Sequence, residues 1–229
     1  MRNSNLKYKI GVFILLLTFE LSAQTNEMVM NDNRIDQDYV PTTELQANIN
    51  SQNLIENKIN LVLEKTKDSL YSIYVINKTS DPISISKQDW SLFLIQEAKN
   101  KNGEWKPVEY WQYSTCGNSY LSEKIKPNGI LKTESLAYFG NFKTEIRFKL
   151  LNSDQIYYSN PINGFVNLSQ FSVPSKITEN RTFERIEKVG GTELMHKVLF
   201  LEQNGMKEYG EKWESYLTKM AELRKKNKN

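Results

Sequence analysis

Cys116 and His196 are the residues best suited to form a nucleophile–base pair, because the chain contains one cysteine and one histidine. Histidine is the usual base near neutral pH, and an imidazole lowers the pKa of a paired thiol and accepts its proton. However, His196 falls in a segment that we expect to form a helix (192–203), and the sequence around Cys116 matches no nucleophile motif. We therefore predict no catalytic residue and a protein that is not an enzyme.

Metal and phosphate sites are not indicated either. One cysteine and one histidine supply too few ligands for a structural zinc site. Residues 31–38 resemble a calcium loop, but they place Arg34 or Ile35 at a ligand position and lack the glycine of such a loop. Neither standard glycine-rich phosphate loop occurs. We predict no metal and no cofactor.

Paired carboxylates are a hydrolytic arrangement that needs no histidine. Four glutamates lie in the central, aromatic-rich part of the chain: Glu104, Glu109, Glu123 and Glu134. Two carboxylates about 5–10 Å apart could hydrolyse a glycosidic bond. Separation along the chain does not give separation in space, so a carboxylate-based hydrolase is the weakest alternative function.

The stretch from Trp105 to Phe142 is the most distinctive part of the sequence, because aromatic residues recur throughout it. Such rings fill the cores of sheets, but with amide neighbours they can also bind a protein or stack on the apolar face of a sugar. We take six residues as a candidate binding surface: Trp105, Tyr110, Trp111, Tyr113, Asn118 and Tyr120.

The elements that must position these residues are short strands. Apolar residues alternate in 59–63 and in 143–150, and turn residues follow at 66–68, 77–82, 102–103 and 126–129. The alternating run 59–63 and the aromatic and β-branched run 70–76, separated by the turn at 66–68, predict a hairpin. Asn102-Gly103 predicts a second hairpin with a type I′ turn. Seven to nine such strands in about 115 residues predict an antiparallel β-sandwich.

The C-terminal part predicts helices. Gly190-Gly191 is typical of a helix break, and from Met206 to Leu223 apolar residues recur at spacings of three and four. We take five residues of this second helix as a candidate partner helix: Tyr209, Trp213, Tyr216, Leu217 and Met220. It could pack across the sheets, dock in a partner's groove or lie on a membrane surface, although its glutamates disfavour the last.

The N-terminus predicts export. Basic residues precede a ten-residue apolar run (10–19), and Ser22-Ala23 offers a cleavage site, which is the layout of a signal peptide. The run would reach only about 15 Å of a bilayer core about 30 Å thick, so we expect no transmembrane segment after cleavage. We expect the protein to be periplasmic or extracellular.

Charge excludes one class of partner. Cleavage after Ala23 lowers Lys+Arg from 30 to 27 and Asp+Glu from 27 to 26, so the net charge falls from +3 to +1. A nearly neutral domain lacks the basic surface that nucleic-acid binding needs. We expect no nucleic-acid partner.

One resemblance adds to this interpretation. The strand at 70–76, the turn Asn-Lys-Thr-Ser-Asp-Pro (77–82) and the short strand at 83–85 are similar to the opening strands of immunoglobulin-like modules. Residues 102–107 and 139–148 resemble uncharacterised secreted proteins of Bacteroidetes-type bacteria. The resemblance covers about residues 58–172 and implies a fold but no activity. The cysteine pair of antibody domains is missing, since Cys116 is alone.

Together these patterns predict a mainly β chain with four parts: a signal peptide (1–23), a flexible polar segment (24–57), an immunoglobulin-like β-sandwich (58–172) and a C-terminal α-helical extension (173–229). The expected function is binding of another protein in the cell envelope or outside the cell. The alternatives are glycan binding by the Trp105–Phe142 stretch and, less favoured, hydrolysis.

Overall fold

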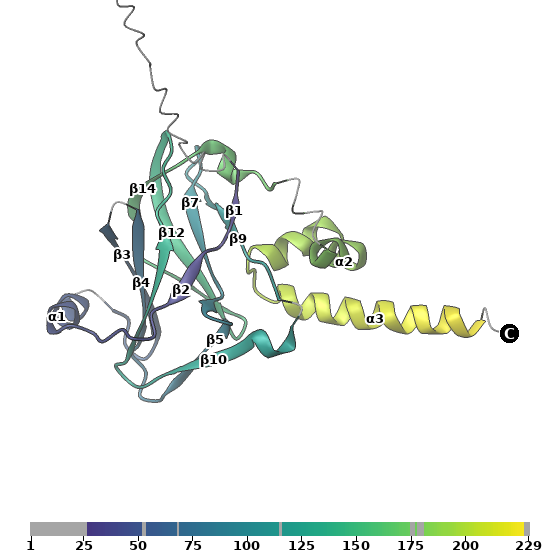
Figure 1. The fold of residues 1–229 in the computed structure, drawn as a ribbon, viewed down its shortest axis with the longest axis horizontal. Coiled ribbons are helices and arrows are strands. Elements are labelled where there is room, and N and C mark those ends of the chain that lie inside the picture. The colour runs from purple at the N-terminus through teal and green to yellow at the C-terminus, as the bar shows by residue number, and fades with distance from the viewer. Residues whose placement is uncertain are drawn as a thin grey trace, which may run out of the picture.

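The computed structural model describes residues 27–51, 54–67, 69–114, 116–174, 177 and 181–226. The predicted signal peptide lies outside them. The described part is mainly β, its larger sheets are antiparallel, and two long helices follow at the C-terminal end, as predicted. Figure 1 shows the strands at the centre, α1 on one side, and α2 and α3 on the other.

Two sheets contribute most of the strands. The four-stranded sheet has the order β2-β11-β4-β3, and the five-stranded sheet has the order β13-β12-β7-β8, with β14 also pairing β12. Their bounds are β2 (Asn33–Ile35), β3 (Ile59–Lys67), β4 (Leu70–Asn77), β11 (Ile130–Leu136), β7 (Leu94–Lys99), β8 (Trp105–Pro107), β12 (Phe142–Asn152), β13 (Gln155–Tyr158) and β14 (Ile162–Val166). The predicted hairpin of β3 and β4 is confirmed.

Two smaller sheets complete the strands. One has the order β10-β5-β6, from Tyr120–Ile125, Ile83–Gln88 and Ser91–Leu92, and the other pairs β1 (Val29–Met30) in parallel with β9 (Glu109–Tyr110). The nearly continuous apolar run 90–95 predicts one buried strand, and the structure shows that this prediction is wrong. The run divides at Phe93, because Leu92 pairs in the three-stranded sheet and Leu94 in the five-stranded one.

The main core draws on both large sheets. Alternate residues of each strand point into it, which is the two-residue period of β structure. Ile73 and Val75 of β4 meet Ile146, Phe148 and Leu150 of β12 in one buried cluster. A second cluster forms where α1 (Thr43–Ser51) covers β3 and β4, with Ile49 against Val62 and Tyr74.

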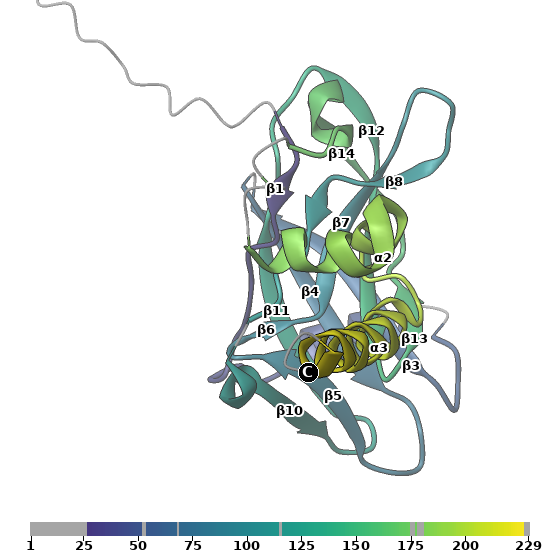
Figure 2. The same cartoon turned by 90° about the vertical axis from the view of Figure 1, so that its right-hand side faces the viewer.

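The C-terminal helices cover the other side of the five-stranded sheet. α2 (Arg181–Leu199) lies across the strands near β7 and β12, while α3 (Gly205–Lys226) points away from them (Figure 2). The predicted helix break is confirmed at Gly191, whose φ of 76° and ψ of 176° interrupt α2. The end predicted at Gln203 is wrong, because the helix stops at Leu199 and Leu201 has a left-handed φ of 52°.

Asparagine side chains link segments that the sheets leave apart. The Asn160 Oδ1 accepts from the Leu63 N–H at 2.8 Å, and its Nδ2 donates to the Leu63 carbonyl at 3.0 Å. The Asn152 Oδ1 accepts from the Ser86 N–H at 2.8 Å, and its Nδ2 donates to the Ser84 carbonyl at 3.1 Å. Asn33 binds the Leu92 N–H at 2.9 Å and its carbonyl at 3.1 Å. Each side-chain amide therefore makes the two hydrogen bonds that a backbone peptide group of a neighbouring strand would make.

The structure corrects two further expectations. Residues of the segment predicted to be flexible form β1, β2 and α1, because Ile35 adds an apolar side chain to the main core and the Asn33 amide binds β6. The turn at Asn102-Gly103 is not type I′, because only Gly103 has a positive φ. The Asn100 Oδ1 instead accepts from the N–H groups of Asn102 and Glu104.

Candidate functional site

The six residues of the predicted binding surface do not share one surface. Trp111 is 1% exposed and Tyr113 is 7% exposed, while Asn118 and Tyr120 are exposed. Trp111 packs in the cluster between the five-stranded sheet and α2, with Phe93 at 4.8 Å between ring centroids. Tyr110 meets Phe183 of α2 edge to face at 6.2 Å. Since α2 covers these rings, the predicted surface is wrong as one contiguous patch.

Trp105 lies in a ladder of cations and rings across the five-stranded sheet. Arg147 of β12 stacks between two rings, 4.4 Å from the centroid of Trp105 and 3.8 Å from that of Tyr158. The Lys99 ammonium also lies over Trp105, at 5.2 Å. Cation–π contacts of this kind stabilise a sheet face, and here they occupy the ring that a sugar would need.

The charges beneath this ladder are paired. Lys149 is 1% exposed, and its Nζ lies 3.3 Å from Glu97 Oε1 and 2.8 Å from Glu202 Oε1. Arg147 Nη2 lies 2.7 Å from Glu97 Oε2. Lys149 lies on the face of β12 opposite its apolar residues, yet it is buried, because the connection between α2 and α3 places Glu202 over it.

An aromatic pocket opens at the base of α3. We define it by its six apolar and aromatic lining residues, with a volume of about 350 Å³: Phe93, Tyr113, Tyr120, Leu121, Leu151 and Met206. The rings of Phe93 and Tyr120 are nearly parallel, with centroids 6.4 Å apart. Two residues of the predicted surface, Tyr113 and Tyr120, are therefore brought together here.

The candidate partner helix is covered along only part of its length. Arg185 lies over the Trp213 ring at 5.3 Å, and Lys188 over the Tyr216 ring at 5.5 Å. Beyond Tyr216, α3 continues past α2 (Figure 1). There Leu217 is 49% exposed and Leu223 is 45% exposed. We call residues 217–226 the projecting end of α3, and it spans about 15 Å.

The projecting end is also cationic. It carries Lys219, Arg224, Lys225 and Lys226 against a single acid, Glu222. Within the described part of the chain, none of these charges makes an ion pair, whereas Glu208, nearer the start of α3, pairs with both Lys212 of α3 and Lys197 of α2. Leu217, Met220 and Arg224 line a shallow hollow of about 290 Å³.

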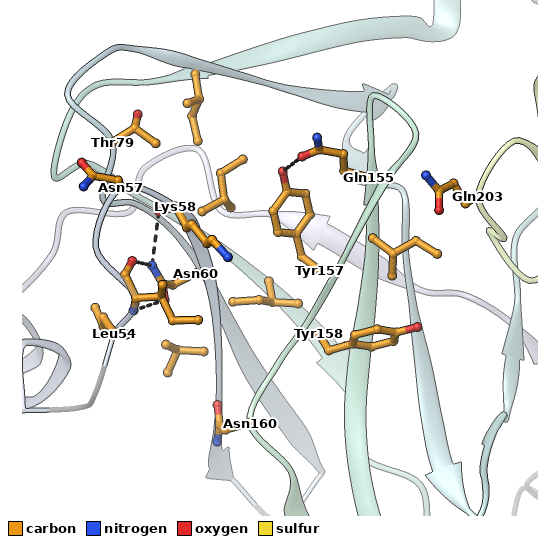
Figure 3. A pocket seen from close by; sticks show the side chains of 16 residues that line it. Leu54, Asn57, Lys58, Asn60, Thr79, Gln155, Tyr157, Tyr158, Asn160 and Gln203 are labelled. Atoms are coloured by element: carbon orange, nitrogen blue, oxygen red, sulfur yellow. Dashed lines mark hydrogen bonds between the residues drawn. The ribbon is translucent and has the colours of Figure 1, made fainter.

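A wide groove separates β3 from β13 (Figure 3). Its volume is about 1010 Å³, and its lining contains five amide side chains and two tyrosines: Asn57, Asn60, Gln155, Asn160, Gln203, Tyr157 and Tyr158. Among the described residues that line it, only Lys58 carries a charge. Sequence reasoning missed this groove, because its residues come from four separate segments with no common motif.

Glu109 is a buried carboxylate. Its Oε1 accepts from the Tyr138 hydroxyl at 2.6 Å, and its Oε2 accepts from the Gln96 N–H at 2.8 Å. Burial raises the pKa of Glu109 to about 7, and the charge of Asp32 acts in the same direction. The side chain therefore titrates near neutral pH while it holds β9 against β7.

The other three glutamates weighed for hydrolysis lie on different elements and have their own partners. Glu123 on β10 pairs with Lys87 at 2.8 Å, and Glu134 on β11 pairs with Lys132 at 2.7 Å. Glu104 precedes β8 and binds Asn100. No contact among these four carboxylates supports a hydrolytic pair within the described residues.

The remaining chemical candidates lie apart in the fold. Cys116 is exposed before η1 (Gly117–Ser119), and His196 on α2 packs against Phe200 at 5.5 Å. The described residues contain no group of three or more His, Cys, Asp or Glu side chains placed to hold a metal ion. In the same part of the chain, no helix has the length and apolar character to cross a membrane.

Comparison with known proteins adds no relative. No family model, no curated protein and no solved structure matches this chain at a significant level.

Proposed function

We propose that the chain is an exported, non-enzymatic module that binds another protein, in the cell envelope or outside the cell, through the projecting end of α3. The observation that carries this proposal is the exposure of Leu217 and Leu223 on a helix whose earlier rings, Trp213 and Tyr216, are half-buried beneath cations of α2. Amphipathic helices commonly bind by laying an apolar face into a partner's groove.

The charge of this segment indicates the chemistry of the partner. Four cations and one acid surround the exposed leucines, so a groove with an apolar floor and an acidic rim would complement them. Charge complementarity of this kind mainly raises the association rate and gives specificity. We expect binding to weaken as salt is added.

The immunoglobulin-like β-sandwich remains part of the proposal. Its support is the main core, to which the four-stranded and five-stranded sheets both contribute. In this arrangement the sheets act as a rigid base, and α2 fixes α3 to it through the cluster that contains Trp111 and Phe183.

The test is capture from a native envelope extract with residues 24–229 as bait, followed by titration of the captured protein. The variant carries Leu217→Gln and Leu223→Gln, since glutamine keeps a high helix propensity. A matched control carries Leu136→Gln and Leu168→Gln, two leucines exposed to a similar degree elsewhere. We expect a salt-sensitive partner that the control retains and the helix variant loses. Equal capture by all three proteins would contradict the proposal.

The groove favours a second candidate function, glycan binding. Amide side chains donate to and accept from hydroxyl groups, and the single lysine suits a neutral ligand. This moves the glycan hypothesis away from the Trp105–Phe142 stretch, whose rings are largely covered. Titration with neutral oligosaccharides tests it. Asn57→Ala with Gln203→Ala should weaken binding, and Leu217→Gln with Leu223→Gln should not.

A further inference from the structure

The aromatic pocket has the form of a site for a small molecule. Its volume of about 350 Å³ lies within the range of about 300–1,000 Å³ that is usual for small-ligand sites. Its apolar and aromatic lining comes from five parts of the chain: the β6–β7 junction, the segment between β9 and η1, β10, the end of β12 and the start of α3. Such convergence gives a preformed shape that no single element provides.

The Tyr113 hydroxyl is a polar group of the pocket that lacks a partner. The side chain is more than nine-tenths buried, and within the described residues its hydroxyl makes no hydrogen bond. The neighbouring Tyr120 differs, because its hydroxyl donates to the Ser114 carbonyl at 2.6 Å. Burial raises the pKa of Tyr113, and the nearby Tyr120 and Asp154 add to the effect. The phenol therefore stays protonated and can donate.

The charges at the rim indicate a neutral ligand. Lys87 is already paired, with its Nζ 2.8 Å from Glu123 Oε2. Asp154, which lines the pocket, is exposed and is not paired with a cation among the described residues. A negatively charged ligand would meet the Asp154 carboxylate without a free cation to offset it.

We propose that the aromatic pocket binds a small, neutral molecule with a flat apolar body and one hydrogen-bond acceptor, which accepts a hydrogen bond from the Tyr113 hydroxyl. The rings of Phe93 and Tyr120 and the side chains of Leu121 and Met206 contact the apolar body. The site is separate from the projecting end of α3, so it does not depend on the protein-binding proposal.

Two probes of nearly equal shape test this assignment. Acetophenone carries a carbonyl acceptor on a single ring, and ethylbenzene lacks the acceptor. Binding is followed by NMR through the amide signals of the isotope-labelled protein. We expect both probes to shift signals around the pocket, with acetophenone binding about five- to tenfold more tightly because its carbonyl accepts a hydrogen bond from the Tyr113 hydroxyl.

Matched variants localise the effect. Tyr113→Phe keeps the ring and removes the hydroxyl, so the two probes should bind equally well. Leu121→Asp places a charge at the rim and should abolish binding of both, while Leu136→Asp, at an exposed leucine outside the pocket, should change neither. The same spectra report whether each variant is folded. No binding of either probe, or an acetophenone preference that survives Tyr113→Phe, would overturn the proposal.

Discussion

The chain uses aromatic side chains beside cations in two regions, and the two differ in what covers them. On the five-stranded sheet, Arg147 fills the space between Trp105 and Tyr158, and α2 covers Trp111. On α3, the contacts with α2 extend only to about Tyr216, and Leu217 faces solvent. Similar residue types thus form a core in one place and an open face in the other, depending on whether a second element reaches them.

The charges of the two regions differ in the same way. Lys149 is buried and touches both Glu97 and Glu202, so its charge belongs to a closed network. The cations of the projecting end of α3 make no ion pair among the described residues. A buried charge must be paired, whereas an exposed one costs little when unpaired. Stability should therefore depend on the first region and binding on the second.

The largest effect is expected at Trp111. Trp111→Ala removes a fully buried ring from the cluster under α2 and should lower the free energy of unfolding by about 3–5 kcal/mol. Urea denaturation measures this loss. Trp111→Phe is the control: it keeps most of the ring volume, and the indole N–H has no hydrogen-bond partner to lose. A similar loss in both variants would show that ring volume is not the cause.

Glu109 should make the stability of the sheet region depend on pH. Its pKa is about 7 in the folded chain, against an ordinary value of 4.5. Between these pH values the unfolded carboxyl ionises and the buried one does not, so the free energy of unfolding falls as pH rises, by about 3 kcal/mol in total.

Glu109→Gln stays neutral and should remove this loss. Denaturation midpoints of the variant and the wild type should agree near pH 4 and separate progressively up to pH 7, with the variant more stable. Glu104→Gln, at an exposed carboxylate, is the control and should show no such divergence. Parallel pH profiles for Glu109→Gln and the wild type would contradict burial as the cause.

Gly191 joins the two regions, and its effect should be intermediate. Its φ of 76° and ψ of 176° are accessible almost only to glycine, although a Cβ there would meet no atom within 4 Å. Gly191→Ala should therefore cost about 1–3 kcal/mol through backbone strain alone. Thermal unfolding measures the cost. Gly210→Ala, in α3 with equally open space, should be neutral or stabilising.

The smallest effect on stability is expected at the projecting end of α3. Leu217→Gln with Leu223→Gln should change the free energy of unfolding by less than about 0.5 kcal/mol, since neither side chain is buried. Calorimetry of the variant and the wild type tests this. A loss of more than about 2 kcal/mol would mean that these leucines are part of the core, and the contrast between the two regions would fail.

Much of the local structure was predictable from sequence, because it is encoded locally. The alternation of 59–63 and the run of aromatic and β-branched residues at 70–76 predict the β3–β4 hairpin, and the spacing from Met206 to Leu223 predicts α3. The partners of each face were not predictable. Trp111 looks like a surface residue until α2 is placed over it, and Lys149 looks exposed until Glu202 is placed beside it.

The candidate sites also depend on which distant segments pack together. Tyr113 and Tyr120 were among the predicted residues and do line one pocket, but Leu151 and Met206 join them from distant positions. The amide-lined groove has no local signal, because β3 and β13 are brought together only by the packing of the two large sheets. A site whose residues come together only through the packing of distant segments leaves no local pattern in the sequence and cannot be predicted from one.

The asparagine side chains that bind backbone groups also bear on association between molecules. A strand at the border of a sheet with free N–H and C=O groups is a template on which another chain can add. Asn160 occupies both groups of Leu63, and Asn152 occupies groups of Ser84 and Ser86. These two side chains thereby occupy part of each border, and we expect them to disfavour the addition of a strand from another molecule in a concentrated solution.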